Sequence, residues 1–163
     1  KELAYRIEET SKNSELCAIR YPRGYSTEEY DFDFSADYTL LKSENSKSLA
    51  ITYGRIFSQV YSARNKINNF DILKLNKIHP INKDIFEILN SYTNIIFFEE
   101  GIKSGGIAEH IGSGLNESGY KGKYVINAIE SEFIPAGKTE DILNKYHLDT
   151  ESVLEAFKTY NAE

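Results

Sequence analysis

Short apolar runs alternate with helical patterns from residue 38 onward, and this alternation limits the possible folds more than any other feature of the chain. The runs with the length of strands are 38–42, 48–54, 70–75, 94–101 and 124–129. Three of them contain almost continuously apolar stretches, at 49–52, 95–98 and 125–129, as expected where helices cover both faces of a parallel sheet. The order therefore predicts the α/β class, in the form of a three-layer αβα sandwich.

The helical patterns between these strands each gather their apolar side chains on one face. The inward sets are Ile56, Phe57, Val60, Tyr61 and Ile67, then Ile85, Phe86 and Leu89, and then Ile107, Ala108, Ile111 and Leu115. One stripe per helix is typical of helices that pack on a sheet. Gly112 and Gly114 destabilise the third helix by about 1 kcal/mol each relative to alanine, so we expect them to allow close packing on the sheet.

The two ends of this region carry signals of their own. Asp149 is a good N-cap for a closing helix, and Leu148 with Val153 has the spacing of a hydrophobic staple. The first strand, 38–42, precedes the turn-like segment 43–47. We expect this strand to pair antiparallel with the next strand, at an edge of the sheet.

Residues 1–24 stand outside the alternation. An amphipathic helical pattern comes first and ends in the polar run 10–15, and the apolar run 16–19 then reads as a buried strand. The apolar face of the helix consists of Leu3, Ala4 and Ile7. The single cysteine, Cys17, is expected to be a small core residue. The chain opens with Lys1, already inside the helical pattern, which favours a fragment of a longer protein.

The segment 25–37 alternates acidic with aromatic side chains and lacks a helical period. It directly follows the breaks at Pro22 and Gly24. We expect a linker packed against a surface, with the domain boundary near Gly24. The alternative is that its aromatic residues mark an interface with a partner.

Charge and hydropathy exclude several classes of protein. The 163 residues are 40% apolar, and 19 basic against 25 acidic residues give a net charge of −6. This apolar content supplies the core of one domain, and the scattered basic residues argue against a nucleic-acid partner. No run approaches the roughly 18 apolar residues of a membrane span, and no leader pattern opens the chain. We therefore expect a soluble, cytoplasmic protein that contacts no membrane.

Arg20 is the leading candidate for a binding residue. It begins the motif Arg-Tyr-Pro-Arg-Gly at 20–24, directly after the predicted strand 16–19, and ligands favour the carboxyl ends of strands in α/β sheets. A guanidinium offers a planar fork of donors to two phosphate oxygens. The alternative is that Arg20 and Arg23 form ion pairs with acids at the domain boundary. Those acids are Glu28, Glu29, Asp31 and Asp33.

Two further groups follow the predicted strand 94–101. Glu99 and Glu100 are neighbours, and neighbouring residues of a strand point to opposite faces, so we expect them to shape an interdomain surface and not to converge on one substrate atom. Gly105-Gly106 precedes a helix, whose free N–H groups suit an anion. Because a full glycine-rich fingerprint is missing, a tight turn is favoured there.

The histidines give no sign of a metal site. His79, His110 and His147 lie far apart in the sequence, and none has a cysteine or histidine at metal-ligand spacing. His110 is expected to be an ordinary, partly exposed side chain.

Several motifs occur in the order found in one enzyme family. They are AIRYPRG at 18–24, ITYG at 51–54, IHPIN at 78–82, FFEEG at 97–101 followed by Gly105-Gly106, and FIPAGKTEDIL at 133–143. In these motifs, and over nearly its whole length, the chain resembles the 1-deoxy-D-xylulose-5-phosphate synthases, which are thiamine diphosphate enzymes of the transketolase type. The resemblance implies that 1–24 end the pyrimidine-binding domain and that 25–37 form a linker. It also implies that 38–163 form a transketolase C-terminal domain, whose five-stranded mixed sheet has its first strand antiparallel.

The same resemblance implies an activity and its partners. Enzymes of this family join pyruvate to glyceraldehyde 3-phosphate with loss of carbon dioxide, and the first arginine of the motif, Arg20 here, contacts the phosphate of the acceptor. The activating glutamate and the diphosphate-magnesium motif lie upstream of the residues present. We therefore expect no catalytic, cofactor-binding or metal-binding residue in this chain, no bound thiamine diphosphate or Mg²⁺, and no activity of the chain alone. The full-length enzyme is expected to be a homodimer.

The chain departs from this family at two places, and other functions stay open. Lys74-Leu75-Asn76-Lys77 stands where the synthases usually have Asp-x-Arg-Phe, and Gly101 stands where asparagine is common. The beta-type component of a 2-oxoacid dehydrogenase and the C-terminal half of a transketolase share the terminal fold, although a transketolase more typically has Ser-Arg in place of Ile19-Arg20. Beyond enzymes, the alternatives are a non-catalytic interaction module and a free-standing small-ligand domain.

Overall fold

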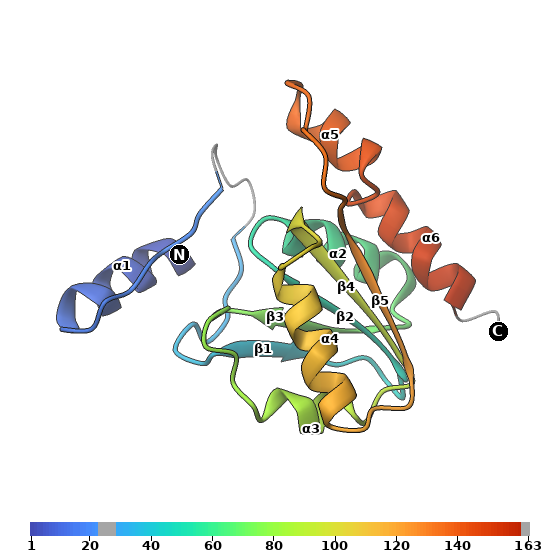
Figure 1. The fold of residues 1–163 in the computed structure, drawn as a ribbon, viewed down its shortest axis with the longest axis horizontal. Coiled ribbons are helices and arrows are strands. Elements are labelled where there is room, and N and C mark those ends of the chain that lie inside the picture. Colours follow the sequence, from blue (N-terminus) through green and yellow to red (C-terminus); the bar gives the residue numbers. More distant parts are fainter. Residues whose placement is uncertain (23–28, 161–163) are drawn as a thin grey trace.

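The computed structural model describes residues 1–22 and 29–160, and within them one five-stranded sheet forms the centre of the fold (Figure 1). Its strands are β1 (Tyr38–Leu41), β2 (Ser48–Tyr53), β3 (Asp71–Leu75), β4 (Asn94–Ile102) and β5 (Lys123–Ile129). They lie in the order β1-β3-β2-β4-β5. Among these described strands β1 alone runs antiparallel to its neighbour, and the other pairs are parallel. The expected mixed sheet with an antiparallel first strand is confirmed.

Strand β1 pairs with β3, and the expected pairing with β2 is wrong. Leu40 of β1 lies opposite Leu73 of β3. Strand β2 is flanked by β3 on one side and by β4 on the other, so it has no free edge to offer. The antiparallel direction and the edge position of β1 agree with the sequence-based prediction. Its partner is β3 and not β2, because the parallel strands β3 and β4 occupy both edges of β2.

Helices cover both faces of the sheet. They are α2 (Ile56–Ile67), α3 (Ile85–Leu89), α4 (Ile107–Glu117), α5 (Thr139–Lys145) and α6 (Thr150–Tyr160). Figure 1 shows α4 in front of the sheet and α2 behind it. Along β2 the side chains alternate between two cores, because Leu49 and Ile51 pack with residues of α3 and α4 while Ala50 packs with residues of α2 and α6. The predicted three-layer sandwich is confirmed.

The buried residues of the helices follow the predicted stripes. At most 2% of the surface is exposed for Ile56, Phe57, Val60, Ala108, Ile111 and Leu115. Both glycines of α4 lie at close contacts. A β-carbon on Gly112 would lie 3.0 Å from Cε1 of Tyr124 in β5, and one on Gly114 would overlap the ring of Phe86 in α3. Gly112 thus packs on the sheet as expected, whereas Gly114 makes room for the neighbouring helix.

Helix α6 begins as the sequence predicts. Oδ1 of Asp149 accepts a hydrogen bond from the N–H of Ser152 at 3.1 Å, and Leu148 and Val153 are fully buried in one core. Burial alone would raise the pKa of Asp149, but hydrogen bonds from Ser152 and Asn144 outweigh this effect and lower the pKa. The capping interaction therefore stabilises the charged carboxylate.

Helix α1 (Glu2–Lys12) belongs to neither helical layer of the sandwich, and the segment 13–22 that follows it forms no strand within the described chain (Figure 1). Leu16 is fully exposed, and Cys17 is exposed as well. The predicted buried strand at 16–19 and the predicted core position of Cys17 are therefore wrong in this structure. A strand needs a neighbour for its backbone N–H and C=O groups, and this segment pairs with no strand of the described sheet.

The described part of the linker, 29–37, packs on the sandwich. The rings of Tyr30 and Phe32 stack with their centroids 5.6 Å apart, and both meet the ring of Phe57 in α2 edge-on, at 4.8 and 5.6 Å. This agrees with the expected packing against a surface. The expected domain boundary near Gly24 lies outside the described residues. None of the helices in the described ranges is long and apolar enough to cross a bilayer.

Candidate functional site

The carboxyl ends of the parallel strands bring together Tyr53 of β2 and Glu99 of β4, which lie 46 residues apart in the sequence. The hydroxyl of Tyr53 donates a hydrogen bond to Oε1 of Glu99 at 2.7 Å. The register pairs Thr52 with Phe98, and this pairing places the next residue of each strand at the same edge. The edge is therefore built by the sheet register and not by proximity in the sequence.

Glu99 anchors the start of helix α4. It is only 3% exposed, and its carboxylate accepts hydrogen bonds from the N–H groups of Ile107 and Ala108, each at 3.0 Å. The partial positive charge at a helix N-terminus stabilises such a carboxylate. A β-carbon on Gly106 would lie 2.7 Å from Oε2 of Glu99, so the close approach of the carboxylate requires glycine at that position.

Glu100 has a separate partner on the opposite face of the sheet. Nε of Arg55, just before α2, lies 3.1 Å from Oε2 of Glu100, and Nη2 of Arg55 bonds to Oε1. Because α2 and α4 lie on opposite faces, the carboxylates of Glu99 and Glu100 diverge. The predicted absence of convergence on one atom is confirmed for this pair of described residues.

The turn before α4 is closed to an external anion. The N–H of Gly105 donates to Oε2 of Glu109 at 2.8 Å, and the N–H of Gly106 donates to the carbonyl of Lys103 at 3.0 Å. Gly105 has a φ of +75°, which glycine adopts without steric cost. The expected tight turn is confirmed. The anion-binding alternative is wrong, because Glu99 already supplies a negative charge to the next N–H groups.

Arg20 lies in the N-terminal segment, outside the described strands of the sheet. Its side chain is exposed, and its charge acts on Tyr53. Burial and the contact with Glu99 raise the pKa of Tyr53 well above its ordinary value, whereas the positive charge of Arg20 works to lower it. The positive charge of Arg20 therefore acts at the end of β2, where Tyr53 stays uncharged.

The acids that were candidates for pairing with Arg20 have other partners where the structure describes them. Glu29 and Asp31 lie 3.6 and 3.9 Å from the ammonium of Lys1. Asp33 accepts a hydrogen bond from the hydroxyl of Ser35 at 2.6 Å. Within residues 1–22 and 29–160, Arg20 forms no ion pair. Outside the described residues lie Arg23 and Glu28.

The resemblance places the magnesium ion in segments upstream of this chain, and the carboxylates at the sheet edge already have other partners. In the described part of the chain, no three His, Cys, Asp or Glu side chains lie together as metal ligands. At the sheet edge, Glu99 is bonded to Tyr53 and to α4, and Glu100 is bonded to Arg55. Neither carboxylate therefore has the freedom of a metal ligand.

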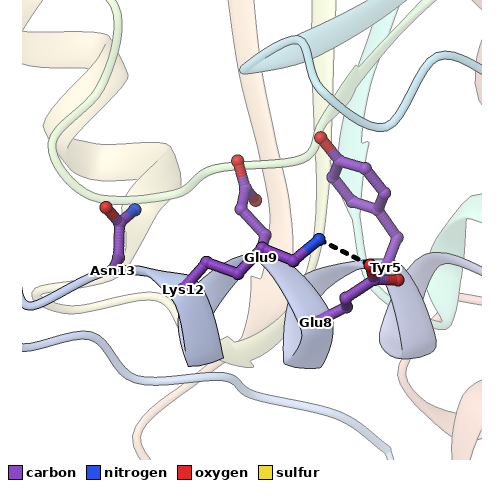
Figure 2. A pocket seen from close by; sticks show the side chains of 5 residues that line it. All are labelled: Tyr5, Glu8, Glu9, Lys12 and Asn13. Atoms are coloured by element: carbon purple, nitrogen blue, oxygen red, sulfur yellow. Dashed lines mark hydrogen bonds and ion pairs between the residues drawn. The ribbon is translucent and has the colours of Figure 1, made fainter.

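A hollow of about 330 Å³ lies on helix α1 and belongs to no other element (Figure 2). Its described lining consists of Tyr5, Glu8, Glu9, Lys12 and Asn13. Lys12 and Glu8 pair across it at 2.6 Å, with both side chains largely exposed. Side chains from a single helix surface do not converge on a ligand, so we assign this hollow no function.

Comparison with known proteins connects these features to one family. The family model described as Transketolase, C-terminal domain matches residues 37–153. The chain belongs to this family. Its five-stranded sheet and two helical layers are therefore those of a transketolase C-terminal domain, as the motifs implied.

The curated relatives of this transketolase C-terminal domain include proteins named 1-deoxy-D-xylulose-5-phosphate synthase. The one from Clostridium perfringens (strain ATCC 13124) is 36% identical over 149 residues, which are 83% of this chain and 23% of the relative. The one from Clostridium tetani is 26% identical over 161 residues, which are 94% of this chain and 26% of the relative. The chain thus spans about a quarter of the length of the curated relatives it matches.

A solved structure titled split gene transketolase, inactive beta4 tetramer, has the same fold. The two structures superimpose with a TM-score of 0.67 at 17% sequence identity. The matched region covers 85% of this chain and 46% of the solved chain. At this identity the likeness concerns the fold alone.

Sequence reasoning missed Lys74 of β3, which is only 4% exposed in this transketolase C-terminal domain. A signal was present, because alternate residues of a strand share a face and Lys74 stands two positions after the buried Ile72. A lysine under a helical layer needs a partner. That partner, Glu2, lies 72 residues away in α1, so no local pattern reveals it.

Proposed function

We propose that this chain is the C-terminal part of a 1-deoxy-D-xylulose-5-phosphate synthase, which condenses pyruvate with glyceraldehyde 3-phosphate with loss of carbon dioxide. The names of the clostridial relatives support this enzyme, as does the order of the motifs along the chain. The observation that carries the proposal is the guanidinium of Arg20, which is exposed and forms no ion pair within residues 1–22 and 29–160.

In this proposal Arg20 binds the phosphate of glyceraldehyde 3-phosphate. Because Arg20 forms no ion pair within the described ranges, its donors are free for charge-assisted hydrogen bonds to phosphate oxygens. Tyr53 at the carboxyl edge of the sheet stays protonated, since burial and Glu99 raise its pKa. An uncharged tyrosine does not repel the phosphate.

We also propose a place for this chain in the longer enzyme. Residues 1–24 end the preceding domain, 25–37 form the linker and 38–163 form the C-terminal domain. The exposed apolar side chains of α1 and of the segment after it support a preceding domain that covers them, because Leu3, Ile7 and Leu16 are 39, 54 and 104% exposed. In this proposal the preceding parts hold thiamine diphosphate and Mg²⁺, the enzyme is a cytoplasmic homodimer, and the present chain is inactive alone.

Replacing Arg20 by alanine in the full-length enzyme tests the phosphate role. We expect R20A to raise the KM for glyceraldehyde 3-phosphate by about tenfold to a hundredfold, because hydrogen bonds to charged groups contribute about 1.5–3 kcal/mol. The KM for pyruvate should change by less than about twofold. Steady-state kinetics with each substrate varied in turn gives both values.

Two further variants sharpen this experiment. R20K keeps the charge and loses the planar fork, so its KM for glyceraldehyde 3-phosphate should fall between those of the wild type and R20A. R64A is the matched control. Arg64 lies in the last turn of α2 and donates a hydrogen bond to the carbonyl of Lys42, so R64A should leave both KM values unchanged. Equal effects of R20A on the two substrates would refute the role of Arg20.

A further inference from the structure

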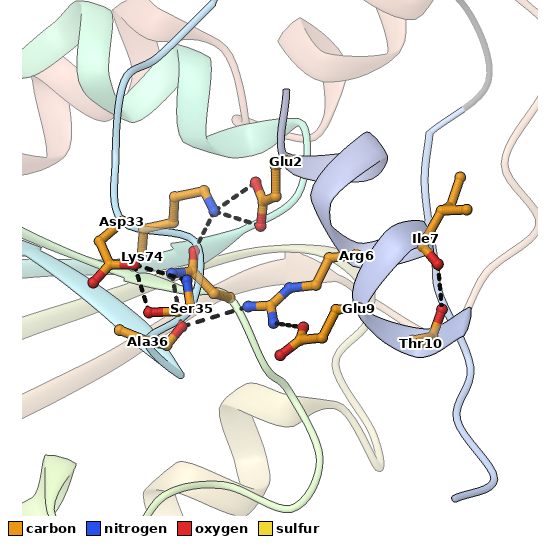
Figure 3. Close-up of polar contacts among 10 residues, drawn as sticks. Glu2, Arg6, Ile7, Glu9, Thr10, Asp33, Ser35, Ala36 and Lys74 are labelled. Atoms are coloured by element: carbon orange, nitrogen blue, oxygen red, sulfur yellow. Dashed lines mark hydrogen bonds and ion pairs between the residues drawn. The ribbon is translucent and has the colours of Figure 1, made fainter. Parts of the chain in front are cut away.

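Helix α1 meets the sandwich through its polar side. Within the described chain it buries none of its side chains, and Leu3 and Ile7 of its apolar face are 39 and 54% exposed. Figure 3 shows Glu2 and Arg6 pointing from α1 toward Lys74 of β3 and Ala36 of the linker. The ring of Tyr5 lies 6.3 Å from that of Phe34 in the linker, but the apolar face formed by Leu3 and Ile7 does not hold this helix in place.

Lys74 is the buried end of this contact. Its side chain is 5% exposed, and its ammonium lies 2.9 and 2.8 Å from the two carboxylate oxygens of Glu2 and 2.5 Å from Oδ1 of Asn76 (Figure 3). It also lies 5.7 Å from the centroid of the Phe57 ring. Burial lowers the pKa of Lys74, Glu2 raises it, and Arg6 lowers it further. Among the described residues, Glu2 is the only acid that pairs with Lys74.

The other polar contacts of α1 with the rest of the molecule are weaker. Lys1 lies 3.6 Å from Glu29 and 3.9 Å from Asp31, and all three side chains are at least half exposed, so solvent screens these pairs. Arg6 reaches the carbonyl of Ala36 at the long distance of 3.4 Å. When one member of a buried ion pair is removed, the charge of the other member stays buried without compensation. This costs far more free energy than losing an exposed pair.

We propose that Glu2 and Lys74 form a charge clasp that docks α1 on the sandwich and thereby positions the segment 13–22. Lys74 stands in one of the two places where the chain departs from the synthase pattern, and Glu2 compensates for its buried positive charge. The clasp leaves the apolar face of α1 free. The segment carries Arg20, and the consequence of the clasp for Arg20 rests on the proposed function, whereas the clasp itself does not.

Amide hydrogen exchange of the 163-residue chain tests the clasp directly. An isolated helix of 11 residues is marginal in water, so amides of α1 should lose protection once the helix is released. We expect E2Q and K74M each to raise exchange rates at residues 5–12 by about tenfold or more, while the amides of β4 keep their wild-type rates. The double variant should exchange no faster than the single variants, because both remove the same interaction.

The pair of Glu8 and Lys12 supplies the control on the same helix. These two side chains pair at 2.6 Å while largely exposed, and both belong to α1. E8Q should therefore change the exchange rates of α1 by less than about twofold. If E2Q leaves α1 as protected as E8Q does, the clasp is refuted, and this comparison holds even if K74M disturbs the fold.

A distance measurement tests the position of the segment. The single native cysteine, Cys17, is exposed, and a spin label there can be paired with one at E87C on the solvent side of α3. The distance distribution should be narrow in the chain with Glu2 and clearly broader in E2Q. An unchanged distribution would overturn the positioning role. Because neither measurement uses a substrate, the clasp and the phosphate role of Arg20 can fail independently.

Discussion

Glu99 illustrates how one buried carboxylate organises the edge of a sheet. It joins the end of β2, through Tyr53, to the start of α4, through two N–H groups. A negative charge that is 3% exposed is tolerated there because three donors and the helix dipole compensate for the lost hydration. The side chain thus has the surroundings of a structural anchor and not those of a catalytic base.

Replacing Glu99 by glutamine tests this role. The introduced amide group would present donors to N–H groups that need an acceptor, so we expect E99Q to lower the free energy of unfolding by about 2 kcal/mol. Urea denaturation measures this change. E100Q is the matched control, because the ion pair of Glu100 with Arg55 is about a third exposed and should contribute no more than about 1 kcal/mol. Equal losses in the two variants would contradict the anchoring role of Glu99.

Helix α6 shows a signal that is local and therefore readable from the sequence. Its start combines a capping carboxylate, Asp149, with the buried pair Leu148 and Val153. All three lie within six positions of one another, so the pattern does not depend on the topology of the sheet. The helix in turn covers one face of the sheet together with α2.

The cap of α6 leads to a prediction for Asp149. D149A should lower the free energy of unfolding by about 1 kcal/mol, whereas D149N keeps an acceptor and should lose only a few tenths. E155A, at an exposed position of the same helix, should change stability by less than about 0.5 kcal/mol. A loss in E155A as large as that in D149A would contradict a capping effect.

The same cap should depend on pH in a defined direction. Hydrogen bonds lower the pKa of Asp149 in the folded state below its ordinary value of 3.8. Its contribution is therefore fully present above the unfolded pKa and is lost as the pH falls through the folded pKa. The stability difference between the wild type and D149N should shift in favour of D149N as the pH is lowered below about 4, which urea denaturation at a series of pH values measures.

The molecule as a whole presents a sheet edge whose neighbouring carboxylates are both engaged. Glu99 and Glu100 are bonded within the chain, and the described residues hold no cluster of metal ligands. We therefore expect calorimetric titration of the 163-residue chain with thiamine diphosphate and Mg²⁺ to show no saturable binding in the micromolar range. The full-length enzyme under the same conditions is the positive control. Saturable binding to the short chain would contradict the proposed division of the enzyme.

The candidate site divides between what the motifs indicate and what the packing adds. The motif at 20–24 marks Arg20 without any structure, and strand geometry alone predicts that Glu99 and Glu100 diverge. The contact of Tyr53 with Glu99 and that of Glu2 with Lys74 span 46 and 72 residues. Such contacts depend on strand order, which periodicity along the chain does not encode.

The amino-acid sequence by itself determined the α/β class, the five strands, the helices α2, α3, α4 and α6, the buried stripes and the cap of α6, because each depends on the spacing of neighbouring residues. Only the tertiary structure decided that β1 pairs with β3, that 16–18 is exposed and that Lys74 has a partner. Hydrophobic periodicity records which face of an element is buried, whereas the neighbour that buries it depends on which edges and faces are left free once the other elements have packed.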